Sequence, residues 1–259
     1  MKKGLVITAV VLLVLGLMIA AGAFALAGFD FGKLGGIQLR EAEYPFDADF
    51  TGIEIDTDET DIVFCPAGDA AGVVCEERDG VQYTVTVEDG TLKIGVDDRR
   101  TWTDRIALFS KKPTMTVCLP SERYDALCVV NRTGDVTIPE GFSFGSIDVT
   151  VSTGDVRCDA SADEHMYIRT STGSVTCGGC SDGLLRIETT TGDVRFDACD
   201  AGSIFVRTST GDVSGTLRSE KIFRARTSTG DVDVPDTVSG GICEITTSTG
   251  DIRITLLGE

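Results

Sequence analysis

The sequence predicts an all-β protein: a parallel β-solenoid, or β-helix, of 19–20-residue coils, preceded by one N-terminal transmembrane helix. Three observations predict this fold. A Thr-Gly-Asp motif recurs at nearly constant spacing, apolar residues alternate with period two on both sides of each motif, and an uncharged run lies near the N-terminus. The 30 glycines and the 7% aromatic content also suit a turn-rich β protein better than a helical one.

The glycines of the motif are 19 or 20 residues apart, and so regular a period indicates stacked supersecondary units. Apolar residues fill the positions seven and five before each glycine and two and four after it, which predicts two short strands with one buried face. A unit of this length cannot enclose a core alone. Neighbouring units therefore have to bury one another's apolar columns.

The motif itself predicts the turn between the two strands. Glycine tolerates the positive φ that a tight corner requires, and the following aspartate can accept hydrogen bonds from neighbouring backbone amides in an Asx-type turn. Ser174 stands in place of one aspartate and offers a weaker version of the same bond. The predicted structural turn residues are Gly134, Asp135, Gly154, Asp155, Gly173, Gly192, Asp193, Gly211, Asp212, Gly230, Asp231, Gly250 and Asp251.

Residues 1–29 are predicted to be a transmembrane anchor. The uncharged run from Gly4 to Phe29 exceeds the roughly 20 residues that cross a bilayer. Two lysines precede the run and acidic residues follow it, which predicts a cytoplasmic N-terminus and an extracytoplasmic repeat domain in a single-pass protein of the cell membrane. A cleaved signal peptide is the alternative, because the Ala-Leu-Ala tripeptide at 25–27 resembles a cleavage site.

The rest of the chain divides into two predicted parts. Residues 121–259 hold seven clear coils, and residues 30–120 form a degenerate β region that we expect to cap the solenoid. Within residues 30–120, the segment 53–62 resembles the repeat unit but lacks its glycine. The segment 83–94 predicts a hairpin around an Asp-Gly turn. The chain carries 41 acidic and 23 basic residues, so we expect no nucleic-acid partner.

The repeats resemble a known family. The step Gly90-Thr-Leu-Lys-Ile94, the segment Val117-Cys-Leu-Pro120 and the serial Thr-Gly-Asp-Val units are similar to those of the bacterial putative-adhesin β-strand-repeat proteins, over roughly Phe50 to Thr255. The resemblance implies a β-helix at the cell envelope. It supplies no catalytic residues and no cofactor.

The nine cysteines all follow the predicted anchor. In an oxidising compartment the sequence-near pairs Cys65/Cys75 and Cys118/Cys128 are the first disulfide candidates, although the odd count argues against complete pairing. Other cysteines occupy an apolar column of the repeat, where they are interpreted as small buried hydrophobic residues.

The segment Cys177-Gly-Gly-Cys180 is a candidate metal site. Repeat stacking would place Cys158 beside Cys177 and Cys180 beside Cys199, and four thiolates could hold zinc or iron. Against this, Cys158 and Cys177 belong to an inward column while Cys180 falls in a turn. A redox role is weaker, because strands rather than a helix flank the motif. We expect neither a metal nor a cofactor.

Thr-x-Thr recurs in five successive coils and would resemble an ice-binding array on a flat outer face. The threonines are in phase with the buried columns, however, so we expect an inward ladder whose hydroxyls bond from coil to coil. The outward positions form a polar face of mixed charge. They are Arg169/Ser171, Glu188/Thr190, Arg207/Ser209, Arg226/Ser228 and Thr246/Ser248.

Together these features predict a non-enzymatic, membrane-anchored cell-envelope protein that presents a rigid β surface for adhesion or envelope-stress interaction, with a protein or glycan ligand at the cell surface. The alternative is an extracellular carbohydrate-active β-helix enzyme. The uniform coil length argues against it, because such enzymes build their clefts from long loops. His165 is the only histidine, so any catalytic pair of a nucleophile and a histidine would have to use this one residue.

Overall fold

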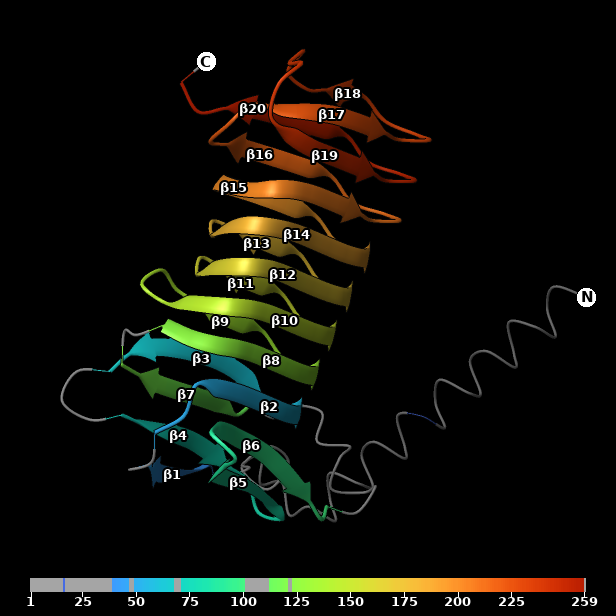
Figure 1. Cartoon of the computed structure of the whole chain (residues 1–259). Helices are drawn as coiled ribbons and strands as arrows, with labels where there is room; N and C mark the ends of the chain where they lie inside the picture. The colour runs from blue at the N-terminus through green and yellow to red at the C-terminus, as the bar shows by residue number, and fades with distance from the viewer. Residues whose placement is uncertain are drawn as a thin grey trace, which may run out of the picture. The chain divides into compact units, whose positions relative to one another are not determined.

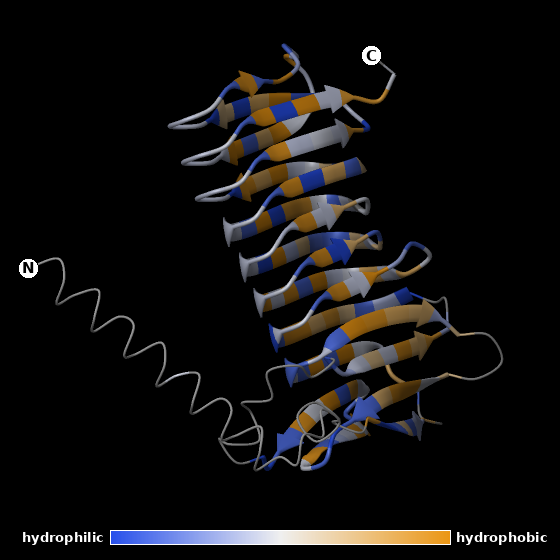
Figure 2. Ribbon diagram, turned by 180° about the vertical axis from the view of Figure 1, so that it is seen from behind, coloured by the Kyte–Doolittle hydropathy of each residue, from blue (hydrophilic) through white to orange (hydrophobic). Residues whose placement is uncertain are grey.

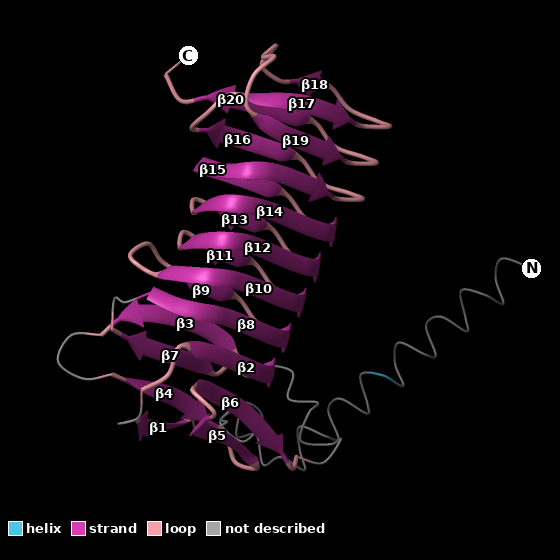
Figure 3. Ribbon diagram, in the orientation of Figure 1, coloured by secondary structure: helices cyan, strands magenta, loops and turns pink. Residues whose placement is uncertain are grey.

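The computed structural model describes residues 39–46, 49–67, 71–100, 112–120 and 123–258, together with Gly16. All but Gly16 and Arg100 of these belong to one compact unit, Leu39–Arg99 with Lys112–Glu259, in which every regular element is a β-strand (Figures 1 and 3). The all-β solenoid prediction is confirmed. Apart from Gly16, the predicted anchor at 1–29 lies outside the described residues. Across the part of the chain that is described, no helix has both the length and the apolar character needed to span a bilayer.

The strands form two facing stacks, which we call sheet A and sheet B. Sheet B contains, in spatial order, β5 (Val81–Glu88), β6 (Thr91–Asp98), β2 (Gly52–Glu59), β8 (Arg123–Thr133), β10 (Ser143–Thr153), β12 (Ser161–Thr172), β14 (Cys180–Thr191), the second half of β15 (Val194–Arg207), β19 (Gly241–Thr246) and β17 (Lys221–Arg226). Sheet A contains β1 (Arg40–Pro45), β4 (Gly72–Glu77), β7 (Thr114–Leu119), β3 (Asp61–Pro66), β9 (Val136–Ile138), β11 (Val156–Cys158), β13 (Val175–Cys177), the first half of β15, β16 (Val213–Leu217), β20 (Ile252–Leu256) and β18 (Val232–Asp233).

The coils do not stack in chain order at either end. The coil β19–β20 lies between β15–β16 and β17–β18, although β17 and β18 come earlier in the chain. At the other end, β2–β3 lies between β6–β7 and β8–β9. Between these exchanges the coils follow one another in parallel register, as Figure 1 shows.

Antiparallel strands continue the stack beyond β6–β7. β5 pairs with β6 through the predicted Asp89-Gly90 turn, which confirms the predicted hairpin. On sheet A, β4 pairs with β7, and β1 pairs with β4. Each sheet therefore ends in antiparallel strands on this side, whereas β17 and β18 at the opposite end are parallel to their neighbours.

The core lies between the two sheets and runs the length of the stack. Ile168 and Leu185 from sheet B and Val175 and Val194 from sheet A are at most 1% exposed, and they belong to the inward columns that the repeat predicts. Figure 2 shows the alternation of hydrophobic and hydrophilic residues along the strands that places these side chains inside. The alternating pattern and the close stacking together explain why units this short form one continuous core.

The corner glycines are required for two reasons. Gly173 has a φ of 146° and Gly192 one of 149°, a region that other residues rarely adopt. A Cβ atom on Gly173 would also overlap the carbonyl oxygen of Gly154 in the preceding coil. The other motif glycines share both properties, so the predicted role of these glycines is confirmed.

The first threonine of each Thr-x-Thr pair bonds to the glycine corner of a neighbouring coil. Thr170 Oγ1 donates to Gly154 O at 3.2 Å, and Thr189 Oγ1 donates to Gly173 O at 3.3 Å. The prediction that both threonines point inward is wrong. Thr172 and its equivalents are exposed, because the chain leaves the strand at this position and the alternation ends.

The motif aspartates form a ladder along the outside of the corner. Asp135 Oδ1 accepts a hydrogen bond from the backbone N–H of Asp155 at 2.8 Å, and Asp155 Oδ1 accepts one from Ser174 at 2.7 Å. The predicted Asx-type bond within one turn is therefore replaced by bonds between coils, because parallel stacking brings the next amide directly over the carboxylate. Among the described residues, Ser174 shows no such bond to Asp193, which leaves a gap in the ladder.

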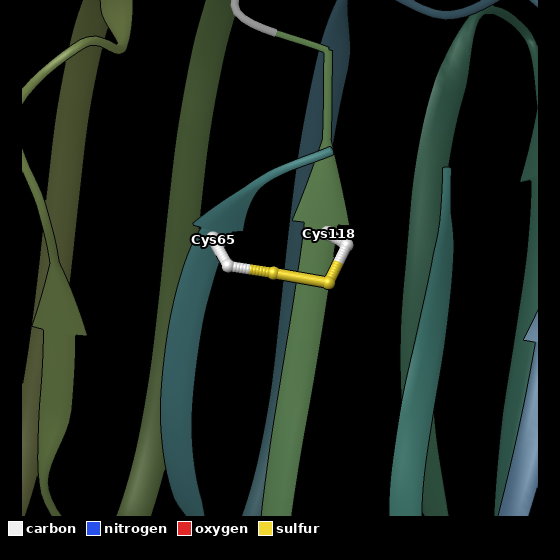
Figure 4. Close-up of a disulfide and its surroundings, with 2 residues drawn as sticks. All are labelled: Cys65 and Cys118. Atoms are coloured by element: carbon white, nitrogen blue, oxygen red, sulfur yellow. A yellow bond between two sulfur atoms is a disulfide. The ribbon is translucent and has the colours of Figure 1, made fainter. Parts of the chain in front are cut away.

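One disulfide links two parallel strands near the N-terminal end. Cys65 on β3 and Cys118 on β7 lie opposite each other in register and are bonded (Figure 4). The predicted pairs Cys65/Cys75 and Cys118/Cys128 are wrong. Pairing follows the register between coils rather than proximity in sequence, and Cys75 and Cys128 are free.

Candidate binding face

The outer face of sheet B from β10 to β17 carries two parallel columns of side chains, which we call the binding face. They point outward because they alternate with the buried residues of the same strands. In order along the stack, the first column is Asp148, Tyr167, Arg186, Phe205, Glu244 and Arg224. The second is Thr150, Arg169, Glu188, Arg207, Thr246 and Arg226.

Glu188 organises the centre of this face. Its Oε2 lies 2.6 Å from Arg169 Nη2, and its Oε1 lies 2.6 Å from Arg186 Nη2. The hydrogen bond from Arg186, supported by the one from Arg169, lowers the pKa of the Glu188 carboxyl against the opposing effect of partial burial. Both guanidinium groups are thereby held in place while remaining more than half exposed.

Two aromatic side chains flank Arg186 in the first column. Tyr167 is 39% exposed on the outer face. Its ring centroid lies 4.3 Å from that of His165 on the same strand, and His165 Nε2 lies 3.2 Å from Asp148 Oδ2. Phe205, two coils further on, is partly exposed. Aromatic and arginine side chains that alternate on a rigid surface are typical of recognition sites.

Two shallow grooves meet at the Arg186–Glu188 pair. One has a volume of about 370 Å³ and extends to Tyr167 and Asp148. The other has a volume of about 210 Å³ and extends to Phe205 and Glu244. Each groove crosses three neighbouring strands, so the two together run across the coils rather than along one strand.

The binding face is basic although the chain carries a net charge of −18. Its two columns contain five arginines (Arg169, Arg186, Arg207, Arg224 and Arg226) against three carboxylates (Asp148, Glu188 and Glu244). Within the described part of the chain, Arg207 forms no ion pair. The face therefore offers positive charge that the protein itself does not neutralise.

The outward direction of five residues of the second column was predicted from the repeat, and all of them except the partly buried Glu188 are exposed: Arg169, Glu188, Arg207, Arg226 and Thr246. The first column, with both aromatic residues, was not predicted. The sequence analysis considered only the outward positions two and four residues before each glycine. Position six before the glycine lies between the buried columns at seven and five. The same alternation would therefore have revealed Tyr167 and Phe205.

The four candidate metal-site cysteines do not come together as predicted. Cys158 and Cys177 are in register and fully buried, as expected for small hydrophobic residues of the inward column. Cys180 lies opposite Asp200 instead of Cys199, because the register shifts around Ala198, whose φ is positive. Among the residues that the structure describes, no three cysteine, histidine or acidic side chains are grouped as metal ligands.

Cys199 instead approaches Cys177 in the core. Their Sγ atoms lie 3.6 Å apart, and both thiols are inaccessible to solvent. Burial raises the pKa of the neighbouring Cys158 thiol well above its ordinary value. A buried thiol that holds its proton is a poor nucleophile and a poor metal ligand, which applies to Cys158. Cys158, Cys177 and Cys199 are all buried in the core, where they pack as small hydrophobic residues.

Solved structures resemble this fold. A putative adhesin from Bacteroides fragilis superposes with a TM-score of 0.53 at 18% identity, and the match covers 84% of this chain and 97% of that one. A putative cell adhesion protein from Clostridium sporogenes gives a TM-score of 0.40 at 11% identity, covering 85% and 100%. A putative adhesin from Parabacteroides distasonis gives 0.40 at 12% identity, covering 85% and 98%. No curated protein matches the chain.

A two-sheet stack of short parallel coils with glycine corners defines a β-solenoid repeat protein. Within that class the chain belongs to the family described as Toastrack DUF4097, whose match extends over residues 50–259. The family resemblance predicted from the Thr-Gly-Asp units, over nearly the same residues, is confirmed.

Proposed function

We propose that this chain is a non-enzymatic, membrane-anchored protein of the cell envelope whose solenoid presents the binding face for adhesion or for interaction with another envelope component under stress. The observation that carries the proposal is the concentration of exposed arginine and aromatic side chains on one rigid face of an otherwise acidic protein. The Bacteroides fragilis protein of similar fold, described as a putative adhesin, supports the same role.

The membrane anchor is tested by fractionation. If residues 4–29 are retained in the membrane, the protein stays in the membrane pellet through a high-salt wash, because hydrophobic insertion is indifferent to ionic screening. Protease added to intact cells then degrades the solenoid. A soluble species that begins at Gly28 would instead show cleavage after Ala27.

Adhesion through the binding face is tested by blocking that face. Cys128 is exposed and lies beside Asp148 in the same outward column, so a bulky polyethylene glycol maleimide on its thiol covers one end of the face. We expect cells that display the labelled protein to lose attachment to a ligand-coated surface.

The matched control moves the label to the opposite sheet. Arg195 is exposed on the outer face of sheet A, in the same strand β15 that carries Arg207. The variant Cys128→Ala/Arg195→Cys carries the same label there, and we expect it to keep attachment. Equal attachment by labelled, control and chain-deficient cells would refute an adhesive role.

A further inference from the structure

We infer that the binding face takes a linear, carboxylate-bearing polysaccharide that lies across the coils. This inference rests on the proposed function and names the class of its ligand. Four observations lead to it: the local charge, the direction of the grooves, the alternation of arginine with aromatic rings, and the orientation of the strands beneath them.

The charge of the outer face changes sign along the stack. Towards the N-terminal end the two columns continue through Glu54 and Asp56, whereas Arg207, Arg224 and Arg226 lie towards the other end. At physiological ionic strength charges are screened beyond about 8 Å. An anionic ligand seated near Arg207 is therefore attracted by the local arginines and is little affected by the acidic residues elsewhere.

The grooves suit an extended polymer rather than a small compact molecule. They join at Arg186 and Glu188 and cross the five strands from β10 to β19. At a strand spacing of about 4.8 Å this path is roughly 19 Å long. Several successive sugar rings can lie along it, each near one strand.

The side chains along this path match the two faces of an acidic sugar. Arginine presents a planar fork of donors that binds a carboxylate in a bidentate manner, and Arg207 is available for this because it forms no ion pair among the described residues. Tyr167 and Phe205 present partly exposed rings against which the apolar C–H face of a sugar ring can pack. Glu188, Asp148 and Glu244 accept hydrogen bonds from sugar hydroxyl groups.

An acidic peptide fits this surface less well. An extended peptide binds a β-sheet by adding to an exposed edge, where its backbone groups find partners. The binding face is the flat side of sheet B, whose backbone groups are already paired within the sheet. A peptide lying across it would leave its own amides without partners, whereas sugar hydroxyl groups can bond to the side chains.

The experiment uses the full chain in a nonionic detergent and calorimetric titration with polygalacturonate, a linear uronic-acid polymer. Fully methyl-esterified polygalacturonate has the same backbone without carboxylates and serves as the matched ligand. We expect binding to the acidic polymer only. Arg207→Gln should weaken it roughly tenfold, as expected for loss of one charge-assisted pair. Tyr167→Ala should weaken it through loss of ring packing.

The matched protein control is Arg195→Gln, which makes the same charge change on the outer face of sheet A and should leave the affinity unchanged. The inference would be overturned if the esterified polymer bound as tightly as polygalacturonate, or if Arg207→Gln and Arg195→Gln lost the same affinity. It would also be overturned if polyglutamate or single-stranded DNA bound as tightly as polygalacturonate or more tightly. Absence of binding to polygalacturonate would overturn it as well. If the label on Cys128 still abolished attachment in that case, and the label on Arg195→Cys did not, the adhesive function would stand and only the ligand class would be wrong.

Discussion

Lys221 Nζ lies 2.7 Å from Asp200 Oδ1, although a complete coil separates the strands that carry them. The coil in between enters its strand at Gly240 and Gly241, where a Cβ would overlap the backbone of its neighbours. Ser219 Oγ donates to the same carboxylate oxygen at 2.8 Å. The lysine thus spans the inserted coil β19–β20 and ties the outermost coil to the regular stack.

The two partners of this ion pair should respond unequally to mutation. The Lys221 side chain is 4% exposed and that of Asp200 is 31% exposed. Asp200→Asn leaves a buried ammonium group without its counter-ion, which costs about 3–5 kcal/mol of unfolding free energy. Lys221→Met leaves a carboxylate that water reaches and should cost less. Urea unfolding measures both, and a larger loss in Lys221→Met would contradict this assignment.

The glycine corners should be intolerant of alanine for a reason beyond backbone conformation. Gly141 has a φ of 96° and free space around it, whereas Gly173 has a φ of 146° and no room for a Cβ. Gly141→Ala should cost about 1–2 kcal/mol in unfolding free energy. Gly173→Ala should cost about 1–3 kcal/mol more, because the coils have to separate. Equal losses would show that close stacking contributes nothing.

Burying a charge in an inward column should disrupt the stack. Val194 is completely buried between Val175 and Val213, so Val194→Asp places an unpaired carboxylate among apolar side chains. We expect a loss of at least about 4 kcal/mol in unfolding free energy. Arg195→Asp, one residue further on the exposed face, is the control and should change the midpoint little. A wild-type midpoint for Val194→Asp would refute the inward assignment.

The aspartate ladder should be extended by filling its gap. Ser174→Asp places a carboxylate where it can accept the backbone N–H of Asp193, as Asp135 does for Asp155. Like charges about 4.8 Å apart in water repel by roughly 0.9 kcal/mol, and salt reduces this repulsion. We expect a gain of about 0.5–1 kcal/mol at 0.15 M salt and a smaller gain at low salt. Ser174→Asn should stabilise without this salt dependence, and a destabilised Ser174→Asp at both salt concentrations would contradict the ladder.

Alkaline conditions should destabilise the fold through its buried thiols. Burial raises the pKa of Cys243 from 9.0 to about 12, and burial with the nearby Glu77 charge does the same for Cys75. Because the folded pKa is raised, the unfolded state loses its proton first, and stability falls between pH 9 and pH 12. Each thiol should cost about 2 kcal/mol by pH 10.5. Cys243→Ala should show a shallower loss in urea unfolding between pH 8 and pH 10.5, and an unchanged slope would argue against the assignment.

Much of the repeat could be predicted from the sequence because every unit carries the same residue pattern, which reflects the same physical constraints. Val175 and Val194 stand at the same distance from their glycines, so alternation places both inside. Gly173 and Gly192 mark corners that other residues cannot form. These are local constraints, and repetition separates them from chance.

The features that could not be predicted depend on which strands pair, and in which register, between segments that are distant in the chain. To predict the Cys65–Cys118 bond one must know that β3 and β7 are neighbours, and no motif near either cysteine indicates this pairing. The displacement of Cys180 from Cys199 follows from one register shift near Ala198. The position of β19 next to β15 is likewise a choice between two similar units, since either could continue the parallel sheet.

The inserted coil has a consequence for the order in which the chain can fold during synthesis. Residues of β17 and β18 emerge before those of β19 and β20, yet they occupy the outer position. A chain delivered from its N-terminus can assemble the coils through β16 as they appear, but the next layer belongs to residues that have not yet arrived. The coil that completes the stack is therefore the last one to be synthesised. A partly synthesised chain that lacks residues 241–256 has an unfilled layer rather than a shorter solenoid.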